Sequence, residues 1–247
     1  MTLALETQAV SISFGGVQAV QRVDLRVANG ERRVVMGPNG AGKTTFFNLI
    51  GGQILPNSGR ILLGGEDITA LPPWQRARRG LSRTFQISRI FLTLTVWENV
   101  FIAASGVGGL SPGSFARAGS DRATTRRIDA LLDHWALGDH RSTPVDRLSY
   151  GTQRLLEIAL AFAIQPRVVM FDEPTAGLSG GERAMVTSRL KALPRDITLM
   201  ITDHDMDVVF QVGDEITVLD RGQAIADGSP SAIRKDRRVH DVYLGSI

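Results

Sequence analysis

A glycine-rich segment, GPNGAGKT from Gly37 to Thr44, has the residue types and spacing that bind phosphate. It follows the short apolar run RRVVM (32–36) and precedes the helical pattern TFFNLI. This is the strand-to-helix context that the pattern G-x-x-x-x-G-K-[ST] requires. Glycines let successive backbone N–H groups point inward and the helix N-terminus adds positive potential, so the loop can wrap a triphosphate. The residues expected around it are Asn39, Gly40, Ala41, Gly42, Lys43, Thr44 and Thr45.

Three side chains of this loop suit a nucleotide with its metal ion. Lys43 supplies a point charge to the β- and γ-phosphates, Thr44 supplies a hydroxyl to Mg²⁺, and Thr45 can reach a nearer phosphate. The alternative is a glycine-rich turn with no ligand. A strand before it and a helix after it favour phosphate binding.

Two adjacent carboxylates follow a second buried strand. The run RVVMFD (167–172) ends at Asp172, and Glu173 comes next. Open α/β sheets bind ligands at the carboxyl ends of their strands. Asp172 could therefore complete the Mg²⁺ shell, and Glu173 could orient and deprotonate an attacking water. Acidic residues also commonly cap strand ends, an alternative that explains one carboxylate better than two.

Three further candidates carry weaker signals. His204 comes just after the apolar run DITLMIT (196–202), again at a carboxyl end, although a single His is more often a surface or core residue. Gln86 follows SRTF, and a neutral amide there can sense Mg²⁺ or the water without adding charge. Phe14 could stack on an adenine face, or it could be a core aromatic.

The segment LSYGTQRLLEIAL (148–160) begins a helix with a small hydroxyl residue and a glycine. A helix N-terminus offers unpaired N–H groups and about half a unit of positive charge. Ser149 adds a hydroxyl, and Gly151 leaves its amide open to approach. The start is either a simple cap or an anion site for a ligand carried by another molecule.

Alternating strand and helix patterns predict the elements that position these residues. The runs at 32–36, 167–172 and 196–202 are apolar on both faces and are separated by helical patterns, so we expect an α/β fold with a parallel sheet covered on both sides. The half-alternating segments QAVSISF, QRVDLRVANGE and GRILLGGEDI predict a flanking antiparallel β-layer.

Strand signals stop between about 87 and 165. Thr95 and Glu98 form a predicted capping box, and RRIDALLDHWAL places Ile128, Leu131, Leu132 and Trp135 on one helical face. These patterns predict an inserted α-helical subdomain. Near the end of the sequence, LDRGQAIADGSP is typical of a hairpin and SAIRKDRRVHDVYLG of a final amphipathic helix.

Length and composition fit one globular domain with an inserted subdomain. The 247 residues are 43% hydrophobic and 21% charged. A net charge of +3 is too small to imply nucleic acid. Its densest basic cluster, RARRGLSR (76–83), is either a solvated helix face or a polyanion site. The absence of Cys excludes disulfides and Cys-based metal sites.

No stretch predicts insertion into a membrane. The N-terminus lacks the features of a secretory signal, and the longest apolar run, IALAFAI (158–164), is well short of the roughly 18 residues that cross a bilayer. We therefore expect any membrane role to be peripheral.

Together these motifs resemble the ATP-binding subunit of an ATP-binding cassette (ABC) transporter, over nearly the whole chain. GPNGAGKTT looks like the Walker A motif, Gln86 the Q-loop, LSYGTQR the signature, VVMFDEP the Walker B motif, and His204 the switch histidine. The resemblance implies a single domain, 1–247. Its expected parts are a P-loop NTPase (RecA-like) core with the β-layer at 1–86 and 166–227, a helical signature subdomain at 87–165, and a C-terminal helical tail at 228–247.

The resemblance also implies a mechanism. In this family the signature of one subunit closes over the ATP held by the Walker A motif of another, so two nucleotides lie between two subunits arranged head to tail. Ser149 and Gly151 then contact the γ-phosphate, Glu173 is the base, and His204 steadies the γ-phosphate and water. Mg²⁺ is held by Thr44, Gln86 and Asp172, and Gln86 links the metal to a membrane subunit.

The motifs depart from the family pattern at three positions. The usual signature is Leu-Ser-Gly-Gly-Gln, so Tyr150 replaces a Gly and Thr152 replaces the Gln. Ser179, in TAGLSGGE, stands where the family often has Asp. These departures bear on contacts with the partner subunit.

Two segments, ARRGLSRTFQISRIFLTLTVWENV and ADGSPSAIRKDRRVHDVYLG, look most like the high-affinity branched-chain amino-acid importer ATPases. This implies two ATPase subunits, two integral membrane permease subunits, a soluble solute-binding protein, and a location at the cytoplasmic face of a bacterial inner membrane. The apolar residues after Gln86 either belong to the core or form a docking surface for a membrane subunit. They are Ile87, Ile90, Phe91, Leu92 and Leu94. Nothing in the chain selects the solute.

Two alternatives differ from a transporter ATPase. One is a soluble ABC ATPase acting on nucleic acid; such relatives usually carry long coiled-coil insertions or tandem cassettes, neither of which the sequence contains. The other is a regulatory module that binds ATP without hydrolysing it, and the presence of both Glu173 and His204 argues against it.

Overall fold

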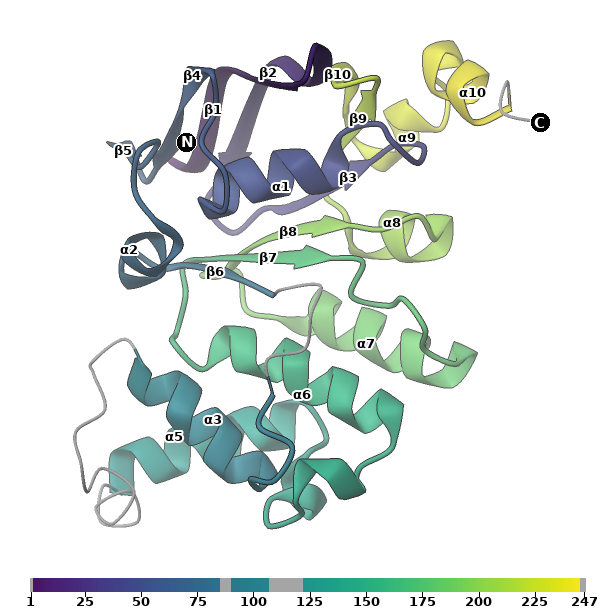
Figure 1. Cartoon of the computed structure of the whole chain (residues 1–247). Coiled ribbons are helices and arrows are strands. Elements are labelled where there is room, and N and C mark those ends of the chain that lie inside the picture. The colour runs from purple at the N-terminus through teal and green to yellow at the C-terminus, as the bar shows by residue number, and fades with distance from the viewer. Residues whose placement is uncertain (1, 85–89, 107–121, 245–247) are drawn as a thin grey trace.

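Two sheets and a group of helices make up the computed structural model, which describes residues 2–84, 90–106 and 122–244 (Figure 1). One sheet has the strand order β10-β9-β3-β8-β7-β6, and the other has the order β2-β1-β4-β5. Figure 1 shows the six-stranded sheet between the smaller sheet and the helices α3, α5 and α6.

Five strands of the larger sheet are parallel, and β10 pairs antiparallel with β9. Its strands are β3 (Arg32–Met36), β6 (Leu81–Arg83), β7 (Val168–Asp172), β8 (Thr198–Thr202), β9 (Glu215–Asp220) and β10 (Gln223–Gly228). Every residue of β3, β7 and β8 is buried. The predicted parallel sheet and the predicted hairpin near the end of the chain are both confirmed.

Side chains alternate between two apolar clusters, one on each face of this sheet. On β7, Val169 and Phe171 pack with the helices α6 (Tyr150–Phe162) and α7 (Gly180–Ala192), whereas Val168 and Met170 pack with α1 (Lys43–Gly51) and the smaller sheet. Strands buried on both faces need no polar alternation, which explains their continuous apolar runs.

The smaller sheet is the predicted antiparallel β-layer. It contains β1 (Leu3–Phe14), β2 (Val17–Ala28), β4 (Ser58–Leu63) and β5 (Glu66–Asp67). Helix α1 lies between the two sheets in Figure 1. Phe46, Phe47, Leu49 and Ile50 of α1 are buried in the cluster that joins them, so the helix that begins at the glycine-rich loop is fixed on both sides.

Helices and short 3-10 turns occupy the described residues between β6 and β7. They are α3 (Val96–Gly106), α5 (Arg122–His134), two turns at Gly138–His140 and Val145–Arg147, and α6. The Thr95–Glu98 capping box is confirmed, with the Thr95 N–H donating to Glu98 Oε2 at 2.7 Å and the Glu98 N–H donating to Thr95 Oγ1 at 3.2 Å. The face predicted for RRIDALLDHWAL is buried at Ile128, Leu132 and Trp135 and partly buried at Leu131.

An aromatic row joins these helices to the sheet. Trp135 stacks on Phe162 of α6 with ring centroids 5.5 Å apart, and Phe162 lies 5.8 Å from Phe171 of β7. Trp135 and Phe171 are fully buried. Rigid aromatic contacts of this kind hold α6 at a fixed distance from the strand that carries Asp172.

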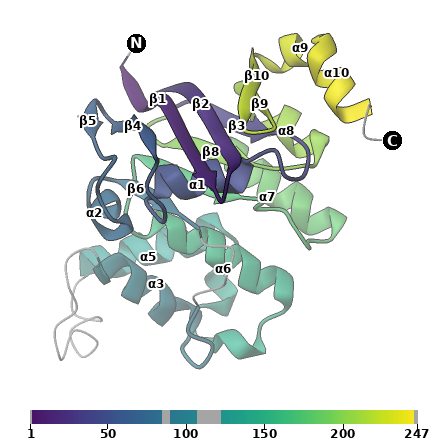
Figure 2. The ribbon, with the colours of Figure 1, turned by 45° about the horizontal axis from the view of Figure 1, so that its top comes forward.

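The end of the chain differs from the prediction in one respect. The single amphipathic helix expected there is two helices, α9 (Pro230–Ile233) and α10 (Arg237–Leu244). Asp236 separates them, because its carboxylate accepts the Arg238 N–H at 2.9 Å and so caps a new helix. Figure 2 shows α9 and α10 beside the β9–β10 hairpin, away from α3, α5 and α6.

None of the helices in the described part of the chain has both the length and the apolar character needed to cross a bilayer.

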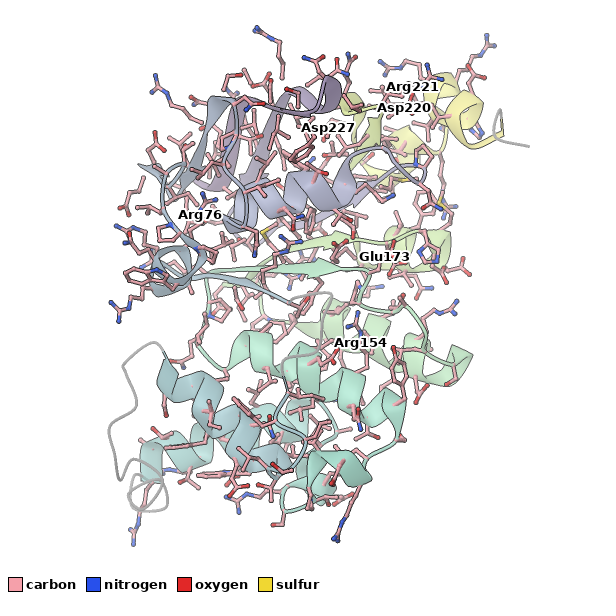
Figure 3. The ribbon with its side chains drawn as sticks, in the orientation of Figure 1. Arg76, Arg154, Glu173, Asp220, Arg221 and Asp227 are labelled. Carbon is pink, nitrogen blue, oxygen red and sulfur yellow. The ribbon has the colours of Figure 1, made fainter. Side chains whose placement is uncertain are left out.

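One residue of the basic cluster 76–83, Arg76, is buried. Neither a solvated helix face nor a polyanion site, the two alternatives considered for this cluster, is therefore right for Arg76. In α2 (Pro73–Arg78), Arg76 is 1% exposed and donates to the carbonyls of Leu49 and Ile50, at the end of α1, and to those of Thr69 and Leu71. Burial lowers its pKa to about 10, so the side chain is still a cation at neutral pH. Its position beside α1 is visible in Figure 3.

We expect Arg76→Ala to lower the free energy of unfolding by about 3 kcal/mol, because it leaves buried carbonyls of α1 without donors. Urea unfolding followed by circular dichroism measures this. Arg78→Ala is the matched control, since Arg78 is exposed on the same helix, and it should leave the midpoint almost unchanged. Equal midpoints for both variants would show that Arg76 does not stabilise the end of α1.

Candidate functional site

The glycine-rich loop connects the end of β3 to the start of α1 and borders an open cavity of about 530 Å³. Gly42 caps α1 with φ of +100°, and a Cβ there would overlap the carbonyl oxygen of Ala19 in β2. Only glycine therefore fits this position. The cavity is lined by Val17, Gln18, Ala19, Gln21, Asn39, Gly40, Ala41, Gly42, Lys43, Thr44, Thr45, Glu173 and Arg221. All seven residues expected around a triphosphate are among them.

Lys43 is buried at the base of this loop, with 8% of its surface exposed. Its ammonium donates to the carbonyls of Gly37 at 2.7 Å and Pro38 at 3.0 Å. Burial lowers the pKa of Lys43, and the charges of Glu173 and Asp172 oppose that shift. A cation held here by neutral carbonyls can exchange them for phosphate oxygens at little desolvation cost.

Asp172, at the end of β7, is 6% exposed and has one oxygen without a hydrogen bond. Its Oδ1 accepts the hydroxyl of Thr202 at 2.5 Å, while Oδ2 lies 3.6 Å from Nη2 of Arg83. A buried carboxylate oxygen without a donor is costly unless something else binds it. The donor chemistry fits Mg²⁺, which prefers carboxylate, hydroxyl and phosphate oxygens.

The described residues supply only part of such a metal shell. Within the described ranges, no group of three or more His, Cys, Asp or Glu side chains could hold an ion by itself. Thr44 lines the cavity and Asp172 is buried next to Thr202, so phosphate oxygens and water would provide the remaining ligands.

Glu173 and His204 face each other across the ends of two neighbouring strands. His204 Nδ1 lies 3.5 Å from Glu173 Oε1, and Glu173 also lines the phosphate cavity. The register of β7 and β8 accounts for this, since Asp172 pairs with Thr202 and each candidate follows within two residues. The structure thus brings together two residues that the sequence separates by 31 positions.

The backbone at Glu173 is left-handed, with φ of +49°. For a residue with a Cβ this conformation costs of order 1–2 kcal/mol, and it persists only where the surroundings impose it. Here the Glu173 N–H donates to Thr202, to the carbonyl oxygen at 3.0 Å and to Oγ1 at 3.2 Å. Strained residues of this kind cluster at active sites.

Ser149 caps α6. Its hydroxyl oxygen accepts the Thr152 N–H at 3.2 Å and lies 2.9 Å from the Thr152 hydroxyl, and the side chain is exposed. Gly151 is buried, and a Cβ there would overlap the carboxylate of Glu182 in α7. Neither Ser149 nor Gly151 lines the phosphate cavity of its own chain. Ser179 forms a capping box with Glu182 at the start of α7.

Two sequence candidates stand apart from this cluster. Phe14, at the end of β1, is 51% exposed and is not among the residues that line the cavity, so the core alternative is wrong for it and adenine stacking stays a prediction. Gln86 and Ile87 lie outside the described residues. Phe91 and Leu92 are half exposed, which excludes the core alternative for them, whereas Ile90 packs against the core.

Several residues near the site were not singled out from the sequence. Arg221 reaches the cavity from the β9–β10 turn, where its carbonyl accepts the side chain of Gln21 at 3.0 Å. No local signal could identify Arg221, because 200 residues separate it from Gln21. Thr202 had a detectable signal, since a hydroxyl residue ends an apolar run there.

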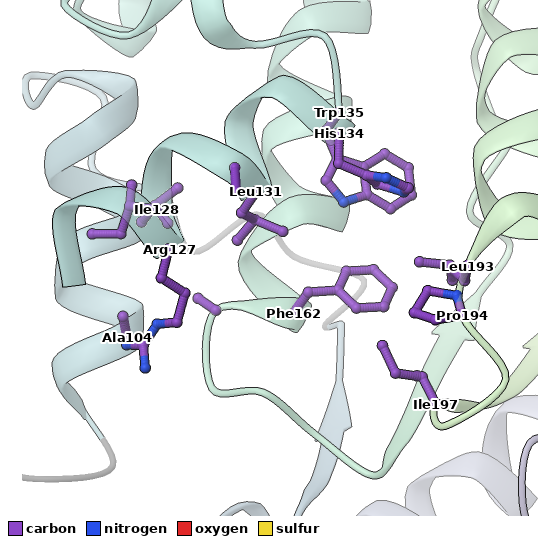
Figure 4. Close-up of a pocket in the computed structure, with 13 residues that line it drawn as sticks. Ala104, Arg127, Ile128, Leu131, His134, Trp135, Phe162, Leu193, Pro194 and Ile197 are labelled. Carbon is purple, nitrogen blue, oxygen red and sulfur yellow. The ribbon is translucent and has the colours of Figure 1, made fainter. Parts of the chain in front are cut away.

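A second cavity, of about 260 Å³, lies among the helices and is mainly apolar (Figure 4). Ile128, Leu131, Trp135 and Phe162 line it, together with the turn at Leu193 to Ile197. The pKa of His134, at its edge, is lowered by burial and by the charge of Arg189. The lining of this cavity has only Arg127 and His134 as charged or titratable side chains, whereas the first cavity is bordered by the glycine-rich loop, Lys43 and Glu173, so we assign nucleotide chemistry to the first cavity.

We expect Gly42→Ala to weaken nucleotide binding at least about tenfold. An added Cβ would overlap the Ala19 carbonyl, so the loop would have to move. A loss of about 1.4 kcal/mol in binding free energy is enough to weaken the affinity tenfold. Titration with a fluorescent ATP analogue measures the affinity. Gly65→Ala is the control, because Gly65 has a similar φ of +85° but open space around its Cα. Equal affinities in the two variants would contradict the close approach.

Comparison with known proteins identifies the family of this chain. A family model described as "ABC transporter" matches residues 20–176. The chain is 37% identical to the high-affinity branched-chain amino acid transport ATP-binding protein BraF of Pseudomonas aeruginosa, over 98% of this chain and 97% of that protein. It is 38% identical to LivG of Escherichia coli, which has the same description, over the same shares of both chains.

Solved structures show the same fold. A nucleotide-free ATP-binding cassette from an ABC transporter superposes with a TM-score of 0.84 at 27% identity, covering 98% of this chain and 99% of the other. The superposition covers nearly the whole of this chain. This chain therefore belongs to the ABC transporter family, as one of its ATP-binding subunits.

Proposed function

We propose that this protein is the ATPase subunit of an ABC importer and that it hydrolyses ATP at the cavity beside the glycine-rich loop. The observation that carries the proposal is the position of Glu173, which lines the cavity next to Lys43 and lies 3.5 Å from His204. A carboxylate and a cation that border the same cavity, with a histidine beside the carboxylate, suit phosphoryl transfer to water.

In the proposed reaction a water molecule attacks the γ-phosphorus of ATP. Glu173 accepts a proton from that water, and the bond from the γ-phosphorus to the bridging oxygen breaks, which leaves ADP and phosphate. Lys43 binds the β- and γ-phosphates, and His204 holds the γ-phosphate and the water in line. Mg²⁺, bound by Thr44, Asp172 and Gln86, would neutralise charge on the phosphates.

We propose further that two such subunits enclose each nucleotide, with Ser149 and Gly151 of one contacting the γ-phosphate bound by the other. The hydroxyl of Ser149 is exposed, and neither Ser149 nor Gly151 lines the phosphate cavity of its own chain, which supports this arrangement. Thr152 stands at the position that is usually Gln, and its hydroxyl hydrogen-bonds to that of Ser149. This replacement therefore helps to hold Ser149 in place as the N-cap of α6. Phe14 would stack on the adenine of the nucleotide.

The same proposal assigns a role to each part of the chain. Residues 1–86 and 166–227 would bind and hydrolyse nucleotide, 87–165 would contact the partner and the membrane subunits, and 228–247 would close the domain. The partners would be a second ATP-binding subunit, two permease subunits and, indirectly, a soluble solute-binding protein, at the cytoplasmic face of the inner membrane. The half-exposed Phe91 and Leu92 support membrane-subunit docking near Gln86.

Branched-chain amino acids are the proposed cargo, because the relatives BraF and LivG are described as subunits that transport them. The nucleic-acid alternative is disfavoured: Arg76 is buried against backbone carbonyls, and the side chain of Arg83, 8% exposed, points to Asp172. The basic cluster 76–83 therefore presents less charge to a polyanion than its sequence suggested.

We expect Glu173→Gln to keep ATP binding, to lower phosphate release by about 10²- to 10⁴-fold, and to trap a nucleotide-bound dimer. Phosphate-release assays at high protein concentration and gel filtration with ATP measure both effects. Glu66→Gln, at an exposed glutamate paired with Arg79, is the control and should behave as wild type. Near-normal hydrolysis by Glu173→Gln would refute the role of Glu173 as base.

The cargo is tested by uptake. Cells that lack this subunit should lose uptake of labelled leucine at low concentration, and the wild-type gene should restore it while Glu173→Gln should not. Restored uptake of a different solute, with leucine uptake unaffected, would reassign the cargo and leave the ATPase proposal intact.

A further inference from the structure

The strained backbone of Glu173 is held from two directions. Its N–H donates to Thr202 of β8, as described above, and its carbonyl oxygen accepts Nη2 of Arg154 at 2.8 Å. Arg154 also donates through Nε to the carbonyl of Pro174 at 3.4 Å. The sheet thus holds the peptide group before the Glu173 Cα and a helix holds the peptide group after it, so the backbone conformation of Glu173 depends on where both elements lie.

A second contact, with Glu157, fixes the Arg154 side chain. Its Nη1 donates to Oε2 of Glu157 at 2.8 Å, one turn further along α6, and the two side chains are 14% and 12% exposed. An arginine held by a fixed carboxylate loses little further side-chain entropy when it binds a carbonyl. In Figure 3 Arg154 lies on α6 directly below Glu173, at the end of β7.

The same helix begins at the signature segment. Ser149 caps α6 five positions before Arg154, about one and a half helical turns. Tyr150 lies against Gly177, where a Cβ would be 3.1 Å from its hydroxyl, and Gly151 packs on the Glu182 carboxylate. The start of α6 therefore contacts the segment that follows Glu173, and Arg154 holds the beginning of that segment.

We propose that Arg154 is a positioning residue for Glu173, through which the position of α6 sets the direction of the catalytic carboxylate. This inference rests on the proposed function. When Ser149 and Gly151 bind the γ-phosphate on the partner, they fix α6, and Arg154 carries that constraint to the Glu173 carbonyl of the same chain. Each nucleotide thereby influences hydrolysis at the other site.

Geometry gives the size of the expected effect. A base displaced by about 1 Å from its productive position can cost about 100-fold in rate. Without Arg154, the carbonyl is free to turn and the left-handed conformation loses one of its two supports. ATP binding depends on the glycine-rich loop and Lys43, which Arg154 does not contact in the hydrogen bonds and ion pairs described for it.

The test uses the purified full-length chain and the variant Arg154→Met, which keeps the length of the side chain and removes its donors. We expect kcat for phosphate release to fall about 10- to 100-fold, with KM and the Kd for ATP within about twofold of wild type. In the Glu173→Gln background, Arg154→Met should still trap the ATP-bound dimer. Arg154→Lys, which can donate to one carbonyl, should recover part of the rate.

Arg141→Met is the matched control, because it removes another arginine–carboxylate pair, Arg141–Asp129, among the same helices and away from Glu173. A purely structural role for Arg154 predicts that both variants lower Tm and that neither changes kcat selectively. Glu157→Gln provides a milder second variant if Arg154→Met does not fold, since it frees Arg154 from its carboxylate, and it should lower kcat at unchanged Tm.

A wild-type kcat in Arg154→Met overturns the inference. If Arg154→Met does not fold, a wild-type kcat in both Arg154→Lys and Glu157→Gln overturns it. Loss of the ATP-trapped dimer in the Arg154→Met, Glu173→Gln double variant also overturns it, because Arg154 would then act on association. Failure of the proposed function has a different signature, in which the wild-type chain itself releases no phosphate.

Discussion

The register of three buried parallel strands, β3, β7 and β8, sets the relative positions of the glycine-rich loop, the carboxylates of Asp172 and Glu173, and His204. Backbone hydrogen bonds pair Val35 with Thr202 and Thr202 with Asp172, so the ends of the strands form one row. The glycine-rich loop leaves this row from β3, the carboxylates leave it from β7, and His204 leaves it from β8. A slip of one residue in β7 would turn Asp172 to the opposite face of the sheet.

Buried charge supports this row. The side chains of Lys43, Asp172 and Arg83 are all less than a tenth exposed, and each has partners among backbone carbonyls, hydroxyls, amides or an opposite charge. Arg76 does the same at the other end of α1. Arginine suits such places because its planar donor group can satisfy several carbonyls at once and stays protonated when burial lowers its pKa.

Helix α6 connects two surfaces that act on different nucleotides in the proposed dimer. Its first turn carries the exposed cap of Ser149, its second turn carries Arg154 against the Glu173 carbonyl, and its apolar face packs through Phe162 on β7. A helix fixed at three points moves as a rigid body. Coupling between the sites would then need no flexible intermediary, since one element contacts both.

The sequence alone determined the class of fold and most of the phosphate-binding loop. Continuous apolar runs, the pattern at Gly37 to Thr44 and the capping box at Thr95 are local signals, and each arises from interactions within a few residues. The placement of Glu173 beside His204 could be anticipated only in outline, as two residues after strand ends. The break at Asp236 was missed, because a carboxylate that caps a new helix looks like any charged residue in an amphipathic pattern.

Only the tertiary structure decided which charges are buried and what they contact. The sequence does not distinguish Arg76, Arg83 and Arg154 from one another. In the structure Arg76 donates to carbonyls at the end of α1, Arg83 lies beside Asp172, and Arg154 donates to the Glu173 carbonyl. Arg221 joins the cavity across 200 residues from Gln21. An arginine reaches far and binds any carbonyl or carboxylate within that reach, so its partner depends on the packing of distant segments, which local sequence does not encode.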